Sequence, residues 1–244
     1  GAIYATATAP LVLTNCSFTG NGVRTGVGSA LYLTGAGLRA QILNCRIQQN
    51  TPAGNGGDDV YLNAVGYVLF QDTTVGSGSR YGIYQAGASS VMALTNCLIS
   101  YQPNHGVVVA SGTAFVQNVT SAGNAGAGLT NSAGTVTVKD SIFWNNTAGG
   151  VGNNGTLTMT YSDSQETRAG AGNVVTNPVF TAGFYLSAAG QPGQTVDSPC
   201  FNIGSATAAA LGLDGRTTRT DGAPDSGMVD LGYHYAGGSP EVSN

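Results

Sequence analysis

The chain has 244 residues, of which 41% are hydrophobic and only 8% are charged, and its formal net charge is −4. This length and apolar content are sufficient for a packed core, so the 38 glycines do not indicate a disordered chain. The small acidic charge leaves no basic surface for phosphates, which argues against binding to nucleic acid or to anionic lipid.

No apolar run reaches the roughly 18–20 residues that a membrane-spanning helix needs. The first residues, GAIYATATAP, have the pattern of a strand and not that of a signal peptide. We therefore expect any export signal to lie elsewhere in a longer chain.

A strand-forming segment recurs seven times along the first two thirds of the chain, with a period that shortens from 29 to 21 residues. One column of this repeat holds Cys16, Cys45, Thr73, Cys97, Val119, Ser141 and Ser162. A second strand comes 11–14 residues before each of these, and its aliphatic column holds Ile3, Leu31, Val60, Ile83, Val107, Leu129 and Val151. A constant register between two strand columns is typical of the coils of a solenoid.

Parallel strands at this spacing leave no room for the helical crossover of an ordinary parallel sheet. Stacking each coil on the previous one removes the difficulty, and the crossover rule favours a right-handed path. The sequence therefore predicts an all-β, right-handed parallel β-helix of about seven coils over residues 1–169. We expect a C-terminal closing segment over 170–235 and a linker over 236–244, and a helix longer than about two turns between residues 25 and 165 would contradict the prediction.

The position immediately before the cysteine column predicts a bend in every coil. It holds Asn15, Asn44, Asp72, Asn96, Asn118, Asp140 and Tyr161. Asn and Asp tolerate left-handed backbone and hydrogen-bond locally, so we interpret this column as a structural ladder at a corner.

The cysteines Cys16, Cys45 and Cys97 share one column, which we expect to point inward as free, buried thiols. Disulfides are the alternative in an exported protein. Parallel stacking disfavours them, because it holds the Cβ vectors side by side instead of converging. The chain has no Cys-x-x-Cys pair, which argues against metal binding by these thiols.

An aromatic column follows the aliphatic one. Tyr4, Tyr32, Tyr61 and Tyr84 stand one residue after inward positions, so strand alternation places them on the outer face. We expect a stripe of roughly parallel rings that can bind sugar rings or another protein. The alternative is that the tyrosines only stabilise the sheet or are covered by a neighbouring domain.

A possible acid–base set falls two residues before the aliphatic column. Asp58, Tyr81 and His105 come in successive coils, with Asp59 and Arg80 adjacent, and these groups suit proton abstraction beside a sugar carboxylate. The alternative is a set of solvated turn residues with loosely paired charges.

Four aspartates near the C-terminus are weak candidates for Ca²⁺ ligands, because they occur in glycine-rich turns. They are Asp214, Asp221, Asp225 and Asp230. Their spacing matches neither an EF-hand nor a calcium-binding nonapeptide array. Turn formation and pairing with Arg216 and Arg219 is the alternative that we favour, so we predict no cofactor apart from possible Ca²⁺.

The repeat resembles that of polymorphic outer membrane proteins, which alternate a GGA-aliphatic motif with an aromatic-x-x-Asn motif. Here GAIY matches the first motif, while Phe18 with Asn21 and Phe143 with Asn146 match the second. The phrases NPVF, DSPC, LDGR and VDLGYHY are similar to a recurrent ending of bacterial surface β-helix proteins.

This resemblance implies a secreted or cell-surface bacterial protein that acts in adhesion or glycan binding. Its expected partner is an extracellular glycan or a protein on a host or neighbouring cell. A polysaccharide lyase or glycoside hydrolase and a purely structural stalk are the alternatives, because a fold alone does not choose among functions.

Overall fold

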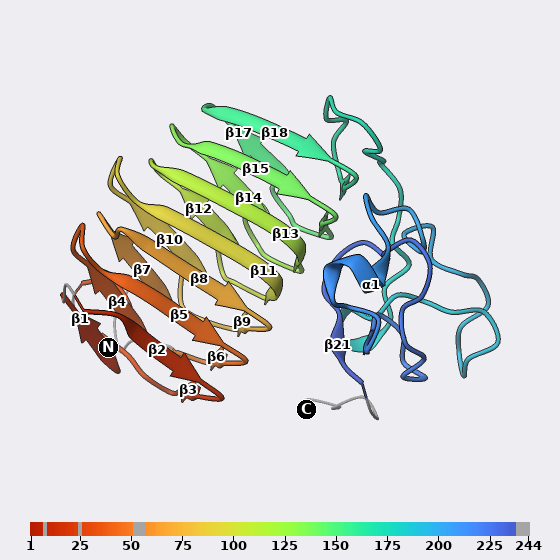
Figure 1. The fold of residues 1–244 in the computed structure, drawn as a ribbon, viewed down its shortest axis with the longest axis horizontal. Helices are drawn as coiled ribbons and strands as arrows, with labels where there is room; N and C mark the ends of the chain where they lie inside the picture. The colour runs from red at the N-terminus through yellow and green to blue at the C-terminus, as the bar shows by residue number, and fades with distance from the viewer. Residues whose placement is uncertain (7–8, 24–25, 51–56, 238–244) are drawn as a thin grey trace.

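The computed structural model describes residues 1–6, 9–23, 26–50 and 57–237, so most of the predicted linker lies outside the described residues. Its coils stack in parallel along one axis (Figure 1). One seven-stranded sheet, which we call face A, contains a strand from every coil. In spatial order these are β1 (Ile3–Ala5), β4 (Leu31–Thr34), β7 (Val60–Asn63), β10 (Ile83–Ala86), β12 (Val107–Val109), β14 (Leu129–Asn131) and β17 (Val151–Asn153).

The second sheet also follows the stack, and a third row of strands joins it across a bend. Two long strands run through this bend and connect the two rows. The second row holds β2 (Leu11–Thr14), β5 (Arg39–Leu43), β8 (Tyr67–Gln71), β11 (Val91–Ser100), β13 (Thr113–Ala122), β15 (Thr135–Lys139) and β18 (Thr156–Thr160). The third holds β3 (Ser17–Thr19), β6 (Arg46–Gln48), β9 (Thr74–Gly76), β16 (Ile142–Trp144) and β19 (Asp163–Ser164), together with the second halves of β11 and β13.

The strand register confirms the predicted columns. Ile3 pairs with Leu31, Leu31 with Val60, and the series continues through Ile83 to Val151 in the last coil. From Leu31 onward this column is buried in the main core, while Ile3 is partly exposed. The described part of residues 25–165 contains no helix, so the parallel β-helix prediction is confirmed.

The predicted bend column is also confirmed. Its seven members, from Asn15 to Tyr161, all have φ between 46° and 55°, the left-handed region that Asn and Asp tolerate best. Asn44 donates to Asn15 at 2.7 Å and Asn96 donates to Asp72 at 2.8 Å, so part of the column forms a side-chain ladder.

A second ladder, at the other end of the third row, lies in the interior. Here asparagines that follow the inward column of the third row by three residues bond from coil to coil: Asn21 donates to Asn50 at 3.0 Å and Asn124 donates to Asn146 at 2.8 Å. In the coil of Ile99, which has no asparagine at this position, Gln102 continues the ladder, since its backbone N–H donates to Asn124 Oδ1 at 3.0 Å. These bonds satisfy buried polar groups at the corner.

Cys16, Cys45 and Cys97 lie in the predicted inward column, and no disulfide joins them. Cys45 and Cys97 are buried, whereas Cys16 in the first coil is only partly buried. Burial raises the pKa of Cys45, and it raises that of Cys97 to about 12, so both remain protonated thiols.

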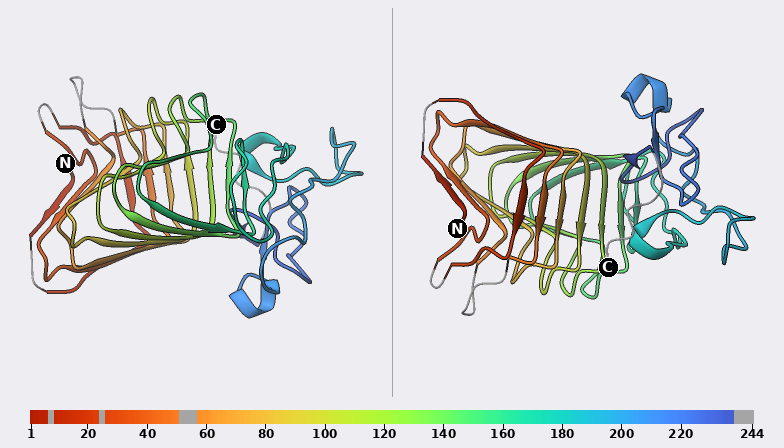
Figure 2. Two further views of the ribbon diagram at one scale, coloured as in Figure 1. Left: turned by 90° about the horizontal axis from the view of Figure 1, so that it is seen from above. Right: turned by 90° about the horizontal axis from the view of Figure 1, so that it is seen from below.

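The closing segment first pairs with the last coil, through a parallel bridge between Asp163 and Val174, and then folds back along the side of the stack (Figures 1 and 2). It contains the 3₁₀ helix η1 (Ala182–Phe184), the single-turn helix α1 (Ala208–Leu211) and an antiparallel pair, β20 (Arg216–Thr217) and β21 (Tyr235–Ala236). Ser205 bonds Asp140, Tyr233 bonds Thr120, and His234 bonds Asn96 through both backbone groups. The segment thus contacts successively earlier coils.

A second hydrophobic core fills the interface between the third row and the closing segment. It contains Ile142 from β16 and Leu186, Cys200 and Leu231 from the closing segment. This packing explains why the outward side chains of β16, Ile142 and Trp144, are apolar. In the described part of the chain, no helix is long or apolar enough to cross a bilayer.

Candidate functional site

The tyrosine ladder consists of Tyr4, Tyr32, Tyr61 and Tyr84, on the outer surface of face A. Strand pairing places the four residues in register. Their ring centroids are 4.9, 5.4 and 5.3 Å apart, and neighbouring planes differ by 19°, 14° and 4°. Tyr4 is exposed and the other three are half-buried, so the prediction of accessible, roughly parallel rings is confirmed.

The ring spacing determines which part of each tyrosine can meet a ligand. An aromatic ring is wider than the strand spacing of about 4.8 Å, so neighbouring rings cannot all lie flat on the sheet. They stack on one another instead, and neighbours cover both faces of Tyr32 and Tyr61. The inner rings therefore present edges and hydroxyl groups outward, and their faces are covered by neighbouring rings.

Face A carries no charge. None of its seven strands contains an Asp, Glu, Lys or Arg residue. Beside the tyrosine ladder runs a second outer column with Thr34, Asn63 and Ala86 in register. The surface therefore combines phenol edges with small polar groups.

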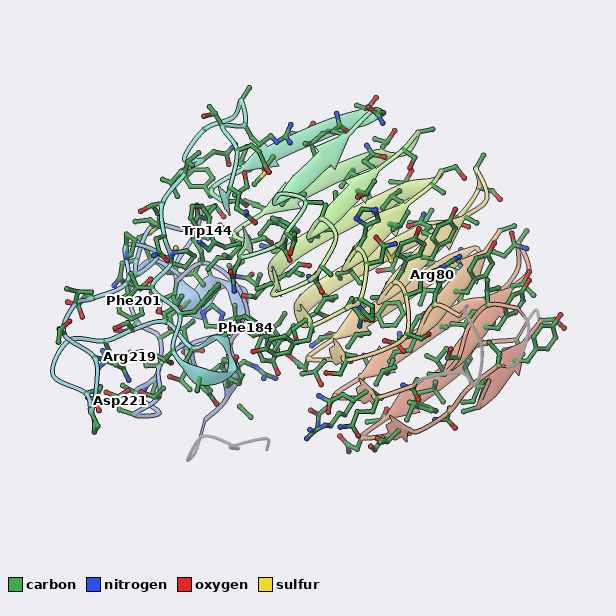
Figure 3. The ribbon with its side chains drawn as sticks, turned by 180° about the vertical axis from the view of Figure 1, so that it is seen from behind. Arg80, Trp144, Phe184, Phe201, Arg219 and Asp221 are labelled. Carbon is green, nitrogen blue, oxygen red and sulfur yellow. The ribbon has the colours of Figure 1, made fainter. Side chains whose placement is uncertain are left out.

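Past Tyr84 the ladder turns sideways, because the next coil has Val108 in the tyrosine column. Tyr84 stacks on Tyr81 at 5.7 Å, and Tyr81 stacks on His105 at 5.5 Å. The guanidinium of Arg80 lies 4.4 Å from the centre of the Tyr81 ring, which gives a cation–π contact. Figure 3 shows Arg80 over the coils, away from Arg219 and Asp221 in the closing segment.

The structure brings the predicted acid–base set together, but it buries the acid of the set, Asp58, where a substrate cannot contact it. Asp58 has no exposed surface, and its carboxylate accepts two hydrogen bonds from Arg80, the shorter at 2.9 Å. Burial raises the pKa of Asp58, and the bonds from Arg80 oppose the rise. The expectation of an open ledge or of a loosely solvated pair is therefore wrong for Asp58.

The ring of His105 is also hydrogen-bonded within the fold. Its Nδ1 accepts the backbone N–H of Ala127 at 2.8 Å, so the neutral ring carries its proton on Nε2. Burial lowers the pKa of His105, which favours this neutral form. With its base atom bonded and one face against Tyr81, His105 ends the aromatic stack and has no free nitrogen to accept a proton.

A second buried acid lies next to Asp58, and the sequence placed it beside the acid–base set without indicating its burial. Asp59 is fully buried, and its Oδ2 accepts from Gln102 Nε2 at 3.0 Å while Oδ1 has no partner among the described residues. Burial, and secondarily the neighbouring Asp58, raises its pKa to about 8. Gly78 allows this placement, because a Cβ there would lie 2.2 Å from Asp59 Oδ2.

The four C-terminal aspartates do not converge. Asp214 is exposed, and Asp221 pairs with Arg219 at 2.6 Å. Asp225 pairs with His234 at 2.8 Å, and Asp230 accepts from Thr218 and from the backbone of Asn202. Among the described residues, no three His, Cys, Asp or Glu side chains are grouped as a metal site. The expected partner of Arg216 is also wrong, since it pairs with Asp72 of the bend column at 2.7 Å.

A hollow of about 680 Å³ lies within the closing segment, and no pattern in the sequence indicates it. Its lining includes Phe180, Gln191, Gln194, Val196 and Thr220. Gln194 donates to Thr220 and Gln191 donates to Asp221, so one N–H of each amide is used within the segment.

Comparison with known proteins decides the family. A family model described as the right-handed β-helix region matches residues 29–190, about two thirds of the chain. The chain belongs to this family. Neither the curated proteins nor the solved structures contain a significant match to this β-helix protein. Since unrelated functions share one fold, the function of this β-helix protein has to be argued from its surface.

Proposed function

We propose that this β-helix protein acts outside the cell as a non-enzymatic adhesion or glycan-binding protein, with the tyrosine ladder as its contact surface. The observation that carries the proposal is the row of four partly exposed tyrosines on a sheet without charged residues. Aromatic side chains with polar tips are typical of recognition surfaces.

The placement of the acid–base set supports a non-enzymatic function. A lyase or hydrolase needs an acid or base within hydrogen-bond reach of its substrate. Asp58 is buried under Arg80, and the only basic nitrogen of His105 is bonded to Ala127. This arrangement stabilises the coils and offers no free general base.

A glycan array and a cell-binding assay test the proposal. The wild type is expected to bind at least one glycan or cell surface, and a Tyr32→Ser, Tyr61→Ser, Tyr84→Ser variant is expected to lose that binding. Tyr67→Ser is the matched control, because Tyr67 is also half-buried but lies on β8, outside face A.

Circular dichroism and thermal unfolding check that each variant retains the fold, and Tyr61→Ser alone serves if the triple variant unfolds. Equal binding by the wild type and the ladder variants would show that the contact surface lies outside the tyrosine ladder. If the wild type binds nothing, the structural stalk becomes the better account. Release of unsaturated sugar products from a polysaccharide would show a lyase instead.

A further inference from the structure

The free groups of the tyrosine ladder are its hydroxyls. Among the described residues, none of the four phenol oxygens has a hydrogen-bond partner within the chain. Burial, and then the neighbouring Tyr84 and Tyr32, raises the pKa of Tyr61, so its phenol is protonated at neutral pH and can both donate and accept. A ligand that meets this edge meets hydrogen-bonding groups before it meets ring faces.

The hydroxyls form a line with one member per coil. The ring centroids repeat at 4.9–5.4 Å along the solenoid axis. This repeat is close to the length of one pyranose residue in an extended polysaccharide. A chain of sugars that runs along the axis therefore presents successive residues to successive tyrosines.

The surroundings of the ladder select against charged ligands. Face A offers no cation to a uronic acid or a sulfate, because its strands contain no Lys or Arg. Among the described residues, the guanidinium of Arg80 lies beside the end of the ladder, and it is already paired with the buried carboxylate of Asp58. Removing that pairing would leave a buried charge uncompensated, which is costly.

From these three features we infer that the ladder binds a neutral, extended polysaccharide that lies along the solenoid axis, held by hydrogen bonds to the tyrosine hydroxyls. The inference rests on the proposed function and specifies its ligand class. Thr34 and Asn63, in the adjacent outer column, supply further hydroxyl and amide groups along the same line.

Replacing tyrosine by phenylalanine separates hydrogen bonding from stacking, because it removes the hydroxyl and keeps the ring. The experiment is affinity electrophoresis of the wild type and of a Tyr32→Phe, Tyr61→Phe, Tyr84→Phe variant. The gels contain either neutral polysaccharides (glucomannan, xyloglucan, hydroxyethylcellulose) or acidic ones (alginate, polygalacturonate). Tyr67→Phe, on the other sheet, is the matched control.

The wild type is expected to be retarded by at least one neutral polysaccharide and not by the acidic ones. Each lost hydroxyl is expected to weaken binding about 2- to 12-fold, so the triple variant loses about tenfold or more. Binding of acidic polysaccharides only, or full binding by the triple phenylalanine variant, would overturn this inference and leave the proposed function standing. If the wild type binds none of these polysaccharides, this inference is overturned, and the glycan array and the cell-binding assay decide separately whether the proposed function stands.

Discussion

Replacing Asp59 by asparagine is expected to stabilise the protein at neutral pH. The carboxyl group is fully buried, one of its oxygens has no partner among the described residues, and the other accepts a single bond from Gln102. Burial and the neighbouring Asp58 raise its pKa to about 8, so the folded protein holds a proton there at pH 7. The unfolded chain releases that proton at its ordinary pKa of about 3.9.

The direction of the pH dependence of stability follows from this difference in pKa between the folded and unfolded states. Because the folded state binds the proton more tightly, the contribution to stability is full below about pH 4 and is lost as pH rises toward 8, at about 1.4 kcal/mol per pH unit. At pH 7 the loss amounts to about 4 kcal/mol. Asparagine does not titrate, but an unpaired amide N–H at this site costs about 1–3 kcal/mol. We expect a net gain of about 1–3 kcal/mol for Asp59→Asn at pH 7.

Unfolding by heat and by denaturant between pH 5 and pH 8 measures the effect, with Asp214→Asn as a control at an exposed aspartate. The stability difference between Asp59→Asn and the wild type should widen as pH rises, by roughly 2–4 °C in unfolding temperature per kcal/mol. A difference that stays constant from pH 5 to pH 8 would show that Asp59 titrates normally and would refute the reasoning.

Three further outcomes are expected. Because all four cysteines are unbridged, thiol titration in denaturant should give four free thiols without reductant, and two fewer would contradict the structure. Burial lowers the pKa of His105 and its Nδ1 accepts from Ala127, so its contribution to stability is present above about pH 6.5 and lost as pH falls below that value. Unfolding at pH 5 and pH 7 should show less acid sensitivity in His105→Gln, and an unchanged pH dependence would argue against this role. Removing the Arg216 contact to Asp72 by Arg216→Ala should speed chymotryptic cleavage of the closing segment more than Arg219→Ala does, and equal rates would show that the contact does not hold the segment down.

The coils were predictable because each repeats the same local pattern. Inward aliphatics such as Leu31, outward tyrosines and the Asn or Asp at the bend each recur in register, and strand alternation then fixes their faces. The strand spacing also implies that neighbouring rings must stack, so the edge-on orientation of the tyrosines could have been predicted in the same way.

The remaining features depend on contacts that no repeat encodes. Asn96 and His234 are 138 residues apart, and nothing in the sequence near either one shows that they meet. Asp59 looks like a turn residue beside Asp58, and its burial depends on the absence of a side chain at Gly78. Of the predicted ion pairs in the closing segment, that of Arg219 with Asp221 is present. Arg216 instead pairs with Asp72, because the segment folds back onto the coils.

The most direct test of the account is to observe which tyrosines meet a ligand. NMR spectra of protein labelled with ¹³C in the tyrosine rings, recorded during titration with oligosaccharides of a neutral polysaccharide that it binds, report each ring separately. The account predicts shifts for Tyr32, Tyr61 and Tyr84, with Tyr67 on the other sheet unchanged. Shifts confined to Tyr67, or to the tyrosines of the closing segment, would contradict it.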